Sequence, residues 1–232
     1  MMVDNRYATA LVIGSVLSLL ATVYLSVAVG TPYWYQYSSP QNNSGEMPSH
    51  DVDSEKTFME KLYQSSGTLG LWWYCIQGPG STGSCRSYTL QQQLSSKYTN
   101  PVSAPSEEDL LRTYLWRCQF VLPLVSLGLV SLAALIGLCS CLCRSLTPTL
   151  FVGVLHLLAG LCSLAATCCF LVGLRLLHRL LVVPEEVEGS LGWSLYLALA
   201  SSPLHMMAGA LLMWASGSHR KNYRRMTAYR VA

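Results

Sequence analysis

Charged side chains are scarce in this sequence. They make up 12% of its 232 residues, about half of the share that is typical of a soluble globular chain. Four stretches contain no Asp, Glu, Lys or Arg, namely residues 7–30, 118–143, 145–174 and 189–218. Each is longer than the roughly 20 apolar residues that a helix needs to cross a bilayer. None shows the polar face that a soluble helix presents at helical spacing, so the sequence predicts four transmembrane helices.

The first stretch has an alternative interpretation as a cleaved signal peptide. The small residues Ala28-Val29-Gly30 are typical of a cleavage site. However, the apolar part is longer than the about 7–15 residues of a signal peptide, and Asp4 accompanies Arg6 before it. We therefore favour a membrane span.

The predicted spans contain no Asp, Glu, Lys or Arg. Transporters, pumps and intramembrane enzymes usually have such charged residues along their substrate path. His156 and His205 are the two histidines within the predicted spans. They are not at metal-ligand spacing on one helix, so we interpret each as a hydrogen bond between helices rather than as a ligand. We expect a protein of the lipid bilayer that is not an enzyme and has no cofactor, no metal, no small-molecule substrate and no nucleic-acid partner.

The distribution of Lys and Arg predicts that both termini lie in the cytoplasm, because the richer side of a membrane protein is cytoplasmic. Seven Lys and Arg residues lie on the side of the termini, namely Arg6, Arg144 and five residues of the tail. Four lie on the other side, namely Arg112, Arg117, Arg175 and Arg179. The sequon Asn42-Asn43-Ser44 agrees, because Asn42 can be glycosylated only in the lumen.

The predicted organisation follows from these spans and this orientation. It consists of a cytoplasmic N-terminus (1–6), a first span (7–30), a large extracellular loop (31–116), a second span (117–143), a cytoplasmic turn (144–147), a third span (148–174), a second extracellular loop (175–189), a fourth span (190–216) and a basic cytoplasmic tail (217–232).

The large loop carries the signals of a β-hairpin. Aromatic and β-branched residues in 68–75 and 85–90 predict two antiparallel strands around a turn at 77–84. Cys75 and Cys85 are the only cysteines of the loop, and an oxidising compartment favours a disulfide between them. Two unpaired thiols are the alternative.

Two short segments of this loop predict helices. Residues 55–63 predict a short helix within it. Ser106 precedes the acidic run Glu107-Glu108-Asp109, and this order predicts a capped helix N-terminus.

Cys139, Cys141 and Cys143 lie at the predicted cytoplasmic end of the second span. Cysteines beside a membrane are candidates for palmitoylation. Packing or a metal site are the alternatives, but no nearby histidine or acidic residue completes a set of ligands. We therefore expect acylation, which an acyl-exchange assay tests: absence of a hydroxylamine-sensitive label would refute it.

One pattern in the large loop consists of an early Trp34, then Gly70-Leu71-Trp72, then Cys75 and Cys85, with Arg117 at the mouth of the second span. This pattern resembles the signature of the claudin and peripheral myelin protein family, which includes PMP-22, EMP and MP20. The resemblance covers the whole chain. It implies a membrane α+β fold, in which a left-handed four-helix transmembrane bundle carries a small extracellular antiparallel β-sheet.

The resemblance also implies roles for these residues. Trp34 and Trp72 would anchor the sheet at the membrane mouth, where the guanidinium of Arg117 can stack on an indole or bond nearby carbonyls. Two departures concern function. The segment 38–64 lengthens the loop, and the chain ends in Arg230-Val231-Ala232 rather than in the Tyr-Val motif with which claudins bind scaffolds.

Two functions fit this pattern. The first is a structural or adhesive protein of the plasma membrane at cell contacts, which affects paracellular permeability and binds other membrane proteins or itself. The alternative is an auxiliary subunit that modulates an ion channel or receptor. The two departures from claudins favour the alternative, whereas the family signature favours the first.

Overall fold

The computed structural model describes residues 5–39, 55–77, 83–97, 106–143, 148–180 and 187–231. Its elements are α1 (Asn5–Gly30), β1 (Tyr35–Ser38), α2 (Glu55–Leu62), β2 (Gly67–Leu69), β3 (Trp73–Ile76), β4 (Ser84–Ser87), α3 (Leu90–Leu94), α4 (Glu107–Cys143), α5 (Pro148–Leu180), β5 (Glu188–Leu191) and α6 (Trp193–Val231). Among the described helices, α1, α4, α5 and α6 are long and apolar enough to cross a membrane. The chain is therefore a multi-pass membrane protein.

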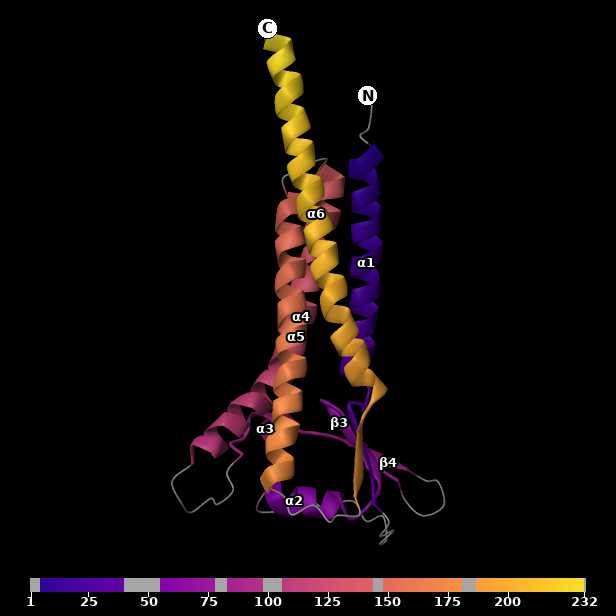
Figure 1. The fold of residues 1–232 in the computed structure, drawn as a ribbon, viewed down its shortest axis with the longest axis vertical. Coiled ribbons are helices and arrows are strands. Elements are labelled where there is room, and N and C mark those ends of the chain that lie inside the picture. The colour runs from indigo at the N-terminus through magenta and orange to yellow at the C-terminus, as the bar shows by residue number, and fades with distance from the viewer. Residues whose placement is uncertain are drawn as a thin grey trace. The chain divides into compact units, whose positions relative to one another are not determined.

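The chain forms two compact units (Figure 1). The bundle unit consists of residues 1–26, 123–164 and 199–232, and the sheet unit consists of residues 27–122 and 165–198. Each of the four long helices contributes one segment to each unit. Both units are therefore held together by contacts between segments that lie far apart in the sequence.

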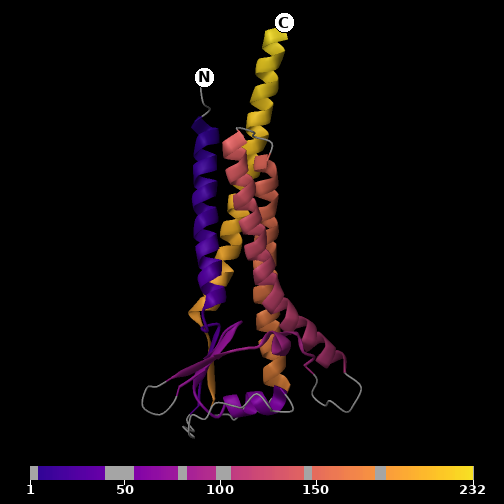
Figure 2. The same cartoon turned by 180° about the vertical axis from the view of Figure 1, so that it is seen from behind.

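In the bundle unit, small residues let the helices run close together (Figures 1 and 2). Gly153 of α5 lies against Gly209 of α6, where an added Cβ atom would stand 2.7 Å from the carbonyl oxygen of Gly153. Ser126 of α4 donates a hydrogen bond of 2.8 Å to the carbonyl oxygen of Ala159 in α5. In lipid there is no hydrophobic driving force for apolar side chains to associate, because the lipid tails are equally apolar. Close backbone packing and such hydrogen bonds therefore stabilise the bundle.

Gly209→Ala should lower the stability of the bundle unit by about 1–3 kcal/mol, as overpacking does elsewhere. The new methyl group would collide with a backbone oxygen, which no side-chain rotation can move away. Gly128→Ala is the matched control, because nothing lies within 4 Å of a Cβ atom at Gly128. There alanine should gain about 1 kcal/mol of helix propensity. Thermal unfolding in detergent compares the two, and equal midpoints would contradict this close approach of α5 and α6.

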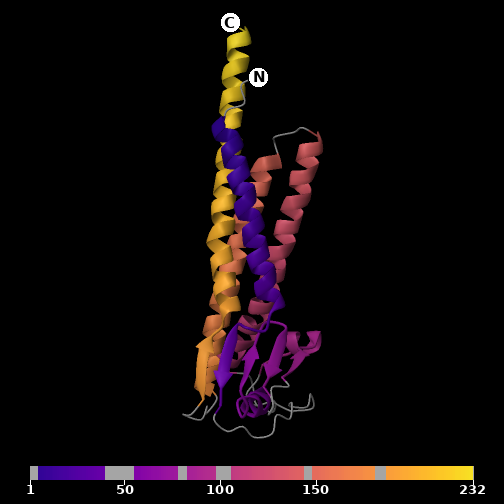
Figure 3. The ribbon, with the colours of Figure 1, turned by 90° about the vertical axis from the view of Figure 1, so that its right-hand side faces the viewer.

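The sheet unit contains a five-stranded antiparallel sheet in the described part of the chain, with the order β4-β3-β2-β1-β5 (Figure 3). The hairpin predicted from sequence is confirmed, because β3 and β4 pair antiparallel with Cys75 opposite Cys85. These two cysteines form the predicted disulfide. Together with the four long helices, the sheet confirms the membrane α+β fold class.

The prediction of one strand over residues 68–75 is wrong. This run folds into β2 and β3, which pair with each other so that Thr68 lies opposite Cys75. The chain reverses at Gly70, whose backbone nitrogen donates to the carbonyl oxygen of Trp73 at 2.7 Å. The aromatic residues alone indicate strand propensity, but the reversal is caused by the packing around Gly70.

The start of α4 and the extent of α2 agree with the predictions from the sequence. The side chain of Ser106 accepts a hydrogen bond from the backbone nitrogen of Asp109, and a carboxylate oxygen of Asp109 accepts one from the backbone nitrogen of Ser106. This reciprocal cap, which satisfies two donors at the helix start, confirms the predicted start of α4. The short helix predicted over 55–63 is confirmed as α2, which buries Met59 and Leu62 in the sheet unit.

Candidate functional site

Trp34 joins the sheet to α1 and α5. Its side chain is 0% exposed, and its Nε1 donates a hydrogen bond of 2.7 Å to the carbonyl oxygen of Ala28. The ring packs edge-on against Phe170 of α5, with 5.1 Å between the centroids. Its backbone nitrogen donates to the carbonyl oxygen of Leu69 in β2. One residue thus fixes the position of the sheet against two helices within the sheet unit.

Gly70-Leu71-Trp72 forms the turn between β2 and β3. A Cβ atom at Gly70 would stand 2.7 Å from the Cα atom of Pro32, so only glycine fits this close approach. Leu71 is buried, and the ring of Trp72 packs against Phe120 of α4 with centroids 4.5 Å apart. The turn therefore places one tryptophan on α4, as Trp34 is placed on α5.

Arg117 of α4 lies where a guanidinium can bond a backbone carbonyl. Its Nε donates a hydrogen bond of 3.1 Å to the carbonyl oxygen of Leu94, the last residue of α3, where a cation also interacts favourably with the helix dipole. The cation that lies over an indole ring is Lys97, whose Nζ stands 4.5 Å from the centroid of Trp116. Both contacts attach the end of α3 and the residues after it to α4.

A cluster of tyrosines fills the centre of the sheet unit, and sequence reasoning did not find it. Tyr37 of β1, Tyr63 after α2 and Tyr74 of β3 are all buried, and the rings of Tyr37 and Tyr63 meet at 4.9 Å. Burial raises the pKa of both of these hydroxyls above the ordinary range of tyrosine. The sequence signal that could have indicated this cluster is the two-residue spacing of Tyr35 and Tyr37, which places both on one face of a strand.

The two outer strands present a different kind of surface. All four residues of β4 and all four of β5 are exposed, and beside β4 the side chain of Trp73 is 42% exposed. Among the described residues, no strand pairs with the outer side of β4 or of β5. The described residues contain no group of three His, Cys, Asp or Glu side chains that could hold a metal ion.

The two intramembrane histidines differ in their contacts. His156 of α5 and Ser18 of α1 share a hydrogen bond of 2.5 Å, which is the helix-to-helix contact that the sequence predicts. The ring of His205 lies 5.7 Å from that of His156. Neither of its nitrogens has a hydrogen-bond partner among the described residues, so the predicted bond is wrong for His205.

Several predicted sites lie wholly or partly outside the described residues. Asn42 is among the residues that the structure does not describe, as are the side chains of Cys141 and Cys143. Cys139 is exposed on α4 and forms no disulfide. A thiol on the outer face of a helix is accessible for acylation, so Cys139 stays a candidate.

The chain matches one family of known proteins. The family is described as PMP-22/EMP/MP20/Claudin tight junction, and the match covers residues 19–214. This range contains Trp34, the Gly70-Leu71-Trp72 turn, the disulfide and Arg117. It also includes the greater part of both compact units.

Proposed function

We propose an adhesive role at cell contacts for this chain, which belongs to the PMP-22/EMP/MP20/claudin family and is a multi-pass membrane protein. In this proposal both termini are cytoplasmic, and the sheet unit faces the space between plasma membranes. There it binds a second membrane protein, such as another copy of the chain in the opposite membrane, and so affects paracellular permeability. The observation that carries the proposal is the outer edge of β4.

The hydrogen-bond pattern fixes which backbone groups of β4 face outward. The backbone nitrogen of Tyr88 donates to the carbonyl oxygen of Trp72, 2.8 Å away. Because bonded and non-bonded pairs alternate in an antiparallel ladder, Ser87 opposite Trp73 is a non-bonded position. The Cα atoms of Cys75 and Cys85 are 4.1 Å apart, as in other non-bonded pairs. The backbone N–H groups of Cys85 and Ser87 therefore point away from β3.

An outward row of N–H and C=O groups is a template for an incoming strand. The disulfide holds β4 in place, so this strand loses little conformational entropy when a partner strand pairs with it. The exposed indole of Trp73 lies beside this edge and offers an apolar anchor of the kind that dominates binding interfaces. This edge therefore supports recognition of an extended segment on a neighbouring protein.

Mixing cells that carry differently tagged copies tests the proposal. We expect enrichment at contacts where both cells express the protein, and none at contacts with cells that lack it. Lower flux of a small tracer across an expressing epithelial layer would support the link to permeability. Absence of contact enrichment, together with co-purification of a larger channel or receptor, would contradict adhesion and favour the auxiliary-subunit alternative.

A further inference from the structure

Two free cysteines contact each other inside the sheet unit. Cys118 belongs to α4 and Cys169 to α5, and both residues lie in this unit. Their side chains are partly buried, and neither forms a disulfide. The thiol of Cys169 shares a hydrogen bond with the thiol of Cys118. Two thiols that lie far apart in the sequence are therefore brought together by the fold.

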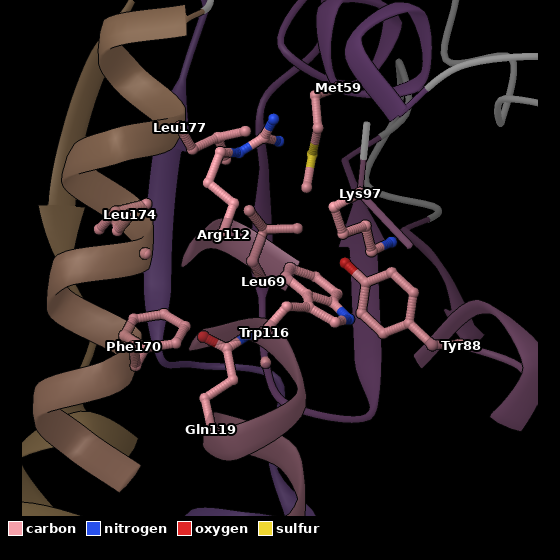
Figure 4. Close-up of a pocket in the computed structure, with 12 residues that line it drawn as sticks. Met59, Leu69, Tyr88, Lys97, Arg112, Trp116, Gln119, Phe170, Leu174 and Leu177 are labelled. Carbon is pink, nitrogen blue, oxygen red and sulfur yellow. The ribbon is translucent and has the colours of Figure 1, made fainter. Parts of the chain in front are cut away.

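The packing of α4 against α5 explains this contact. Gly173 of α5 faces α4, where a Cβ atom built on it would lie 3.6 Å from the Oε1 atom of Gln119. Cys118 directly precedes Gln119, and Cys169 lies one helical turn before Gly173. Figure 4 shows Gln119 and Phe170, the residues that follow the two cysteines, lining one pocket from the two helices. The thiol contact is thus part of the interface between α4 and α5.

This interface leaves room for the two helices to come closer. The sulfur atoms of a disulfide are about 2 Å apart, which is shorter than any contact between two thiols. At Gly173 a Cβ atom would be at an ordinary contact distance from α4, and glycine has no Cβ atom. A small approach of α4 to α5 at this level therefore meets no side chain of Gly173.

The sheet unit already contains one product of oxidation. The disulfide between Cys75 and Cys85 belongs to the same unit as Cys118 and Cys169, and such bonds form and persist in an oxidising compartment. Cys118 directly follows Arg117, where the charge-free part of α4 begins. Because both thiols are partly buried between helices, a small uncharged oxidant can reach them more easily than a folded oxidoreductase can.

We propose that Cys118 and Cys169 are a redox-sensitive pair, which a small hydroperoxide such as hydrogen peroxide converts into a second disulfide. One cysteine loses its proton, and its thiolate attacks the peroxide. A sulfur–oxygen bond forms, the oxygen–oxygen bond breaks and hydroxide leaves, which gives a sulfenic acid. The sulfur of the other thiol then attacks the sulfenic sulfur, a sulfur–sulfur bond forms and water leaves. Two thiols are oxidised, one peroxide takes up two electrons, and the two thiol protons end in two molecules of water.

The new bond would join α4 to α5 within the sheet unit. Trp72 packs on α4 and Trp34 on α5, so the bond would also fix these two attachments of the sheet relative to each other. It closes a much longer loop than the disulfide between Cys75 and Cys85 does, and longer loops give more stabilisation in the chain-entropy model. We therefore expect oxidation to raise the thermal midpoint by about 5–10 °C.

Treatment of the full chain with hydrogen peroxide tests this proposal. The protein is purified in detergent without a reductant and oxidised, and its remaining thiols are then alkylated with N-ethylmaleimide. Mass spectrometry of the unreduced digest identifies linked peptides. We expect a new link between Cys118 and Cys169 and the rise in thermal midpoint. Absence of this link in the oxidised unmodified protein, or a link from Cys118 to Cys168 in its place, would overturn the proposal.

Two variants separate this pair from the neighbouring thiol. Cys118→Ser should abolish both the link and the rise in thermal midpoint on oxidation. Cys168→Ser is the matched control, because Cys168 is the exposed neighbour of Cys169, and this variant should keep both responses. A rise in midpoint that persists in Cys118→Ser would contradict the assignment to this pair. The link itself is measured in the unmodified protein, so this result does not depend on the folding of either variant.

Discussion

Trp34→Ala should destabilise the sheet unit by about 3–5 kcal/mol, the usual cost of removing a large buried aromatic ring. The substitution leaves a cavity against Phe170 and removes the hydrogen bond that Trp34 donates to the carbonyl oxygen of Ala28. The free energy of unfolding of a folded domain is only about 5–15 kcal/mol. We therefore expect most of the variant protein to be retained inside the cell. Surface biotinylation measures delivery, and thermal unfolding of purified protein measures stability.

Trp73→Ala is the matched control for Trp34→Ala. It removes the same side chain from the same unit, but this indole is 42% exposed and its loss should cost less than about 1 kcal/mol. Trp34→Phe separates the effect of the cavity from that of the lost hydrogen bond, because phenylalanine keeps most of the packing and cannot donate to Ala28. Similar surface levels for Trp34→Ala and Trp73→Ala would contradict the anchoring role of Trp34.

Removal of the disulfide by the double substitution Cys75→Ser and Cys85→Ser should have the second largest effect. The bond joins residues separated by 10 positions, and closing such a loop stabilises a fold by about 3 kcal/mol in the chain-entropy model. Strand β4 pairs only with β3 among the described strands, so without the bond this edge should fray first. We expect retention in the secretory pathway, measured by surface biotinylation.

Cys168→Ser provides the control for the disulfide. Cys168 is an exposed cysteine of α5 that forms no disulfide, and its substitution should leave surface delivery and the thermal midpoint unchanged. If the double variant reaches the surface as well as Cys168→Ser does, the disulfide does not stabilise this unit.

The features that the sequence predicts are those with a local or compositional cause. Long charge-free stretches have few structures available in lipid other than helices, so the four long helices follow from composition. The hairpin follows from strand-forming residues around a turn and from the isolated pair Cys75 and Cys85. The cap by Ser106 follows from its position before an acidic turn.

The features that the sequence does not predict depend on distant contacts. Strand β5 reads Glu-Gly-Ser-Leu, which has little strand propensity, and it forms because it pairs with β1 through Tyr35 and Leu191. The chain reversal at Gly70 depends on Pro32 from another segment. The bond from Arg117 to Leu94 likewise requires α3 to be packed on α4.

The proline variant of the outer strand tests the proposed adhesion most directly. Ser87→Pro removes one outward N–H group and no bond to β3, and proline is tolerated at such edge positions. Ser87→Ala keeps the N–H group and is the control. In mixed cells with matched surface levels, we expect Ser87→Ala to be enriched at contacts like the unmodified protein and Ser87→Pro to lose that enrichment. Equal enrichment of the two variants would contradict pairing through the edge of β4.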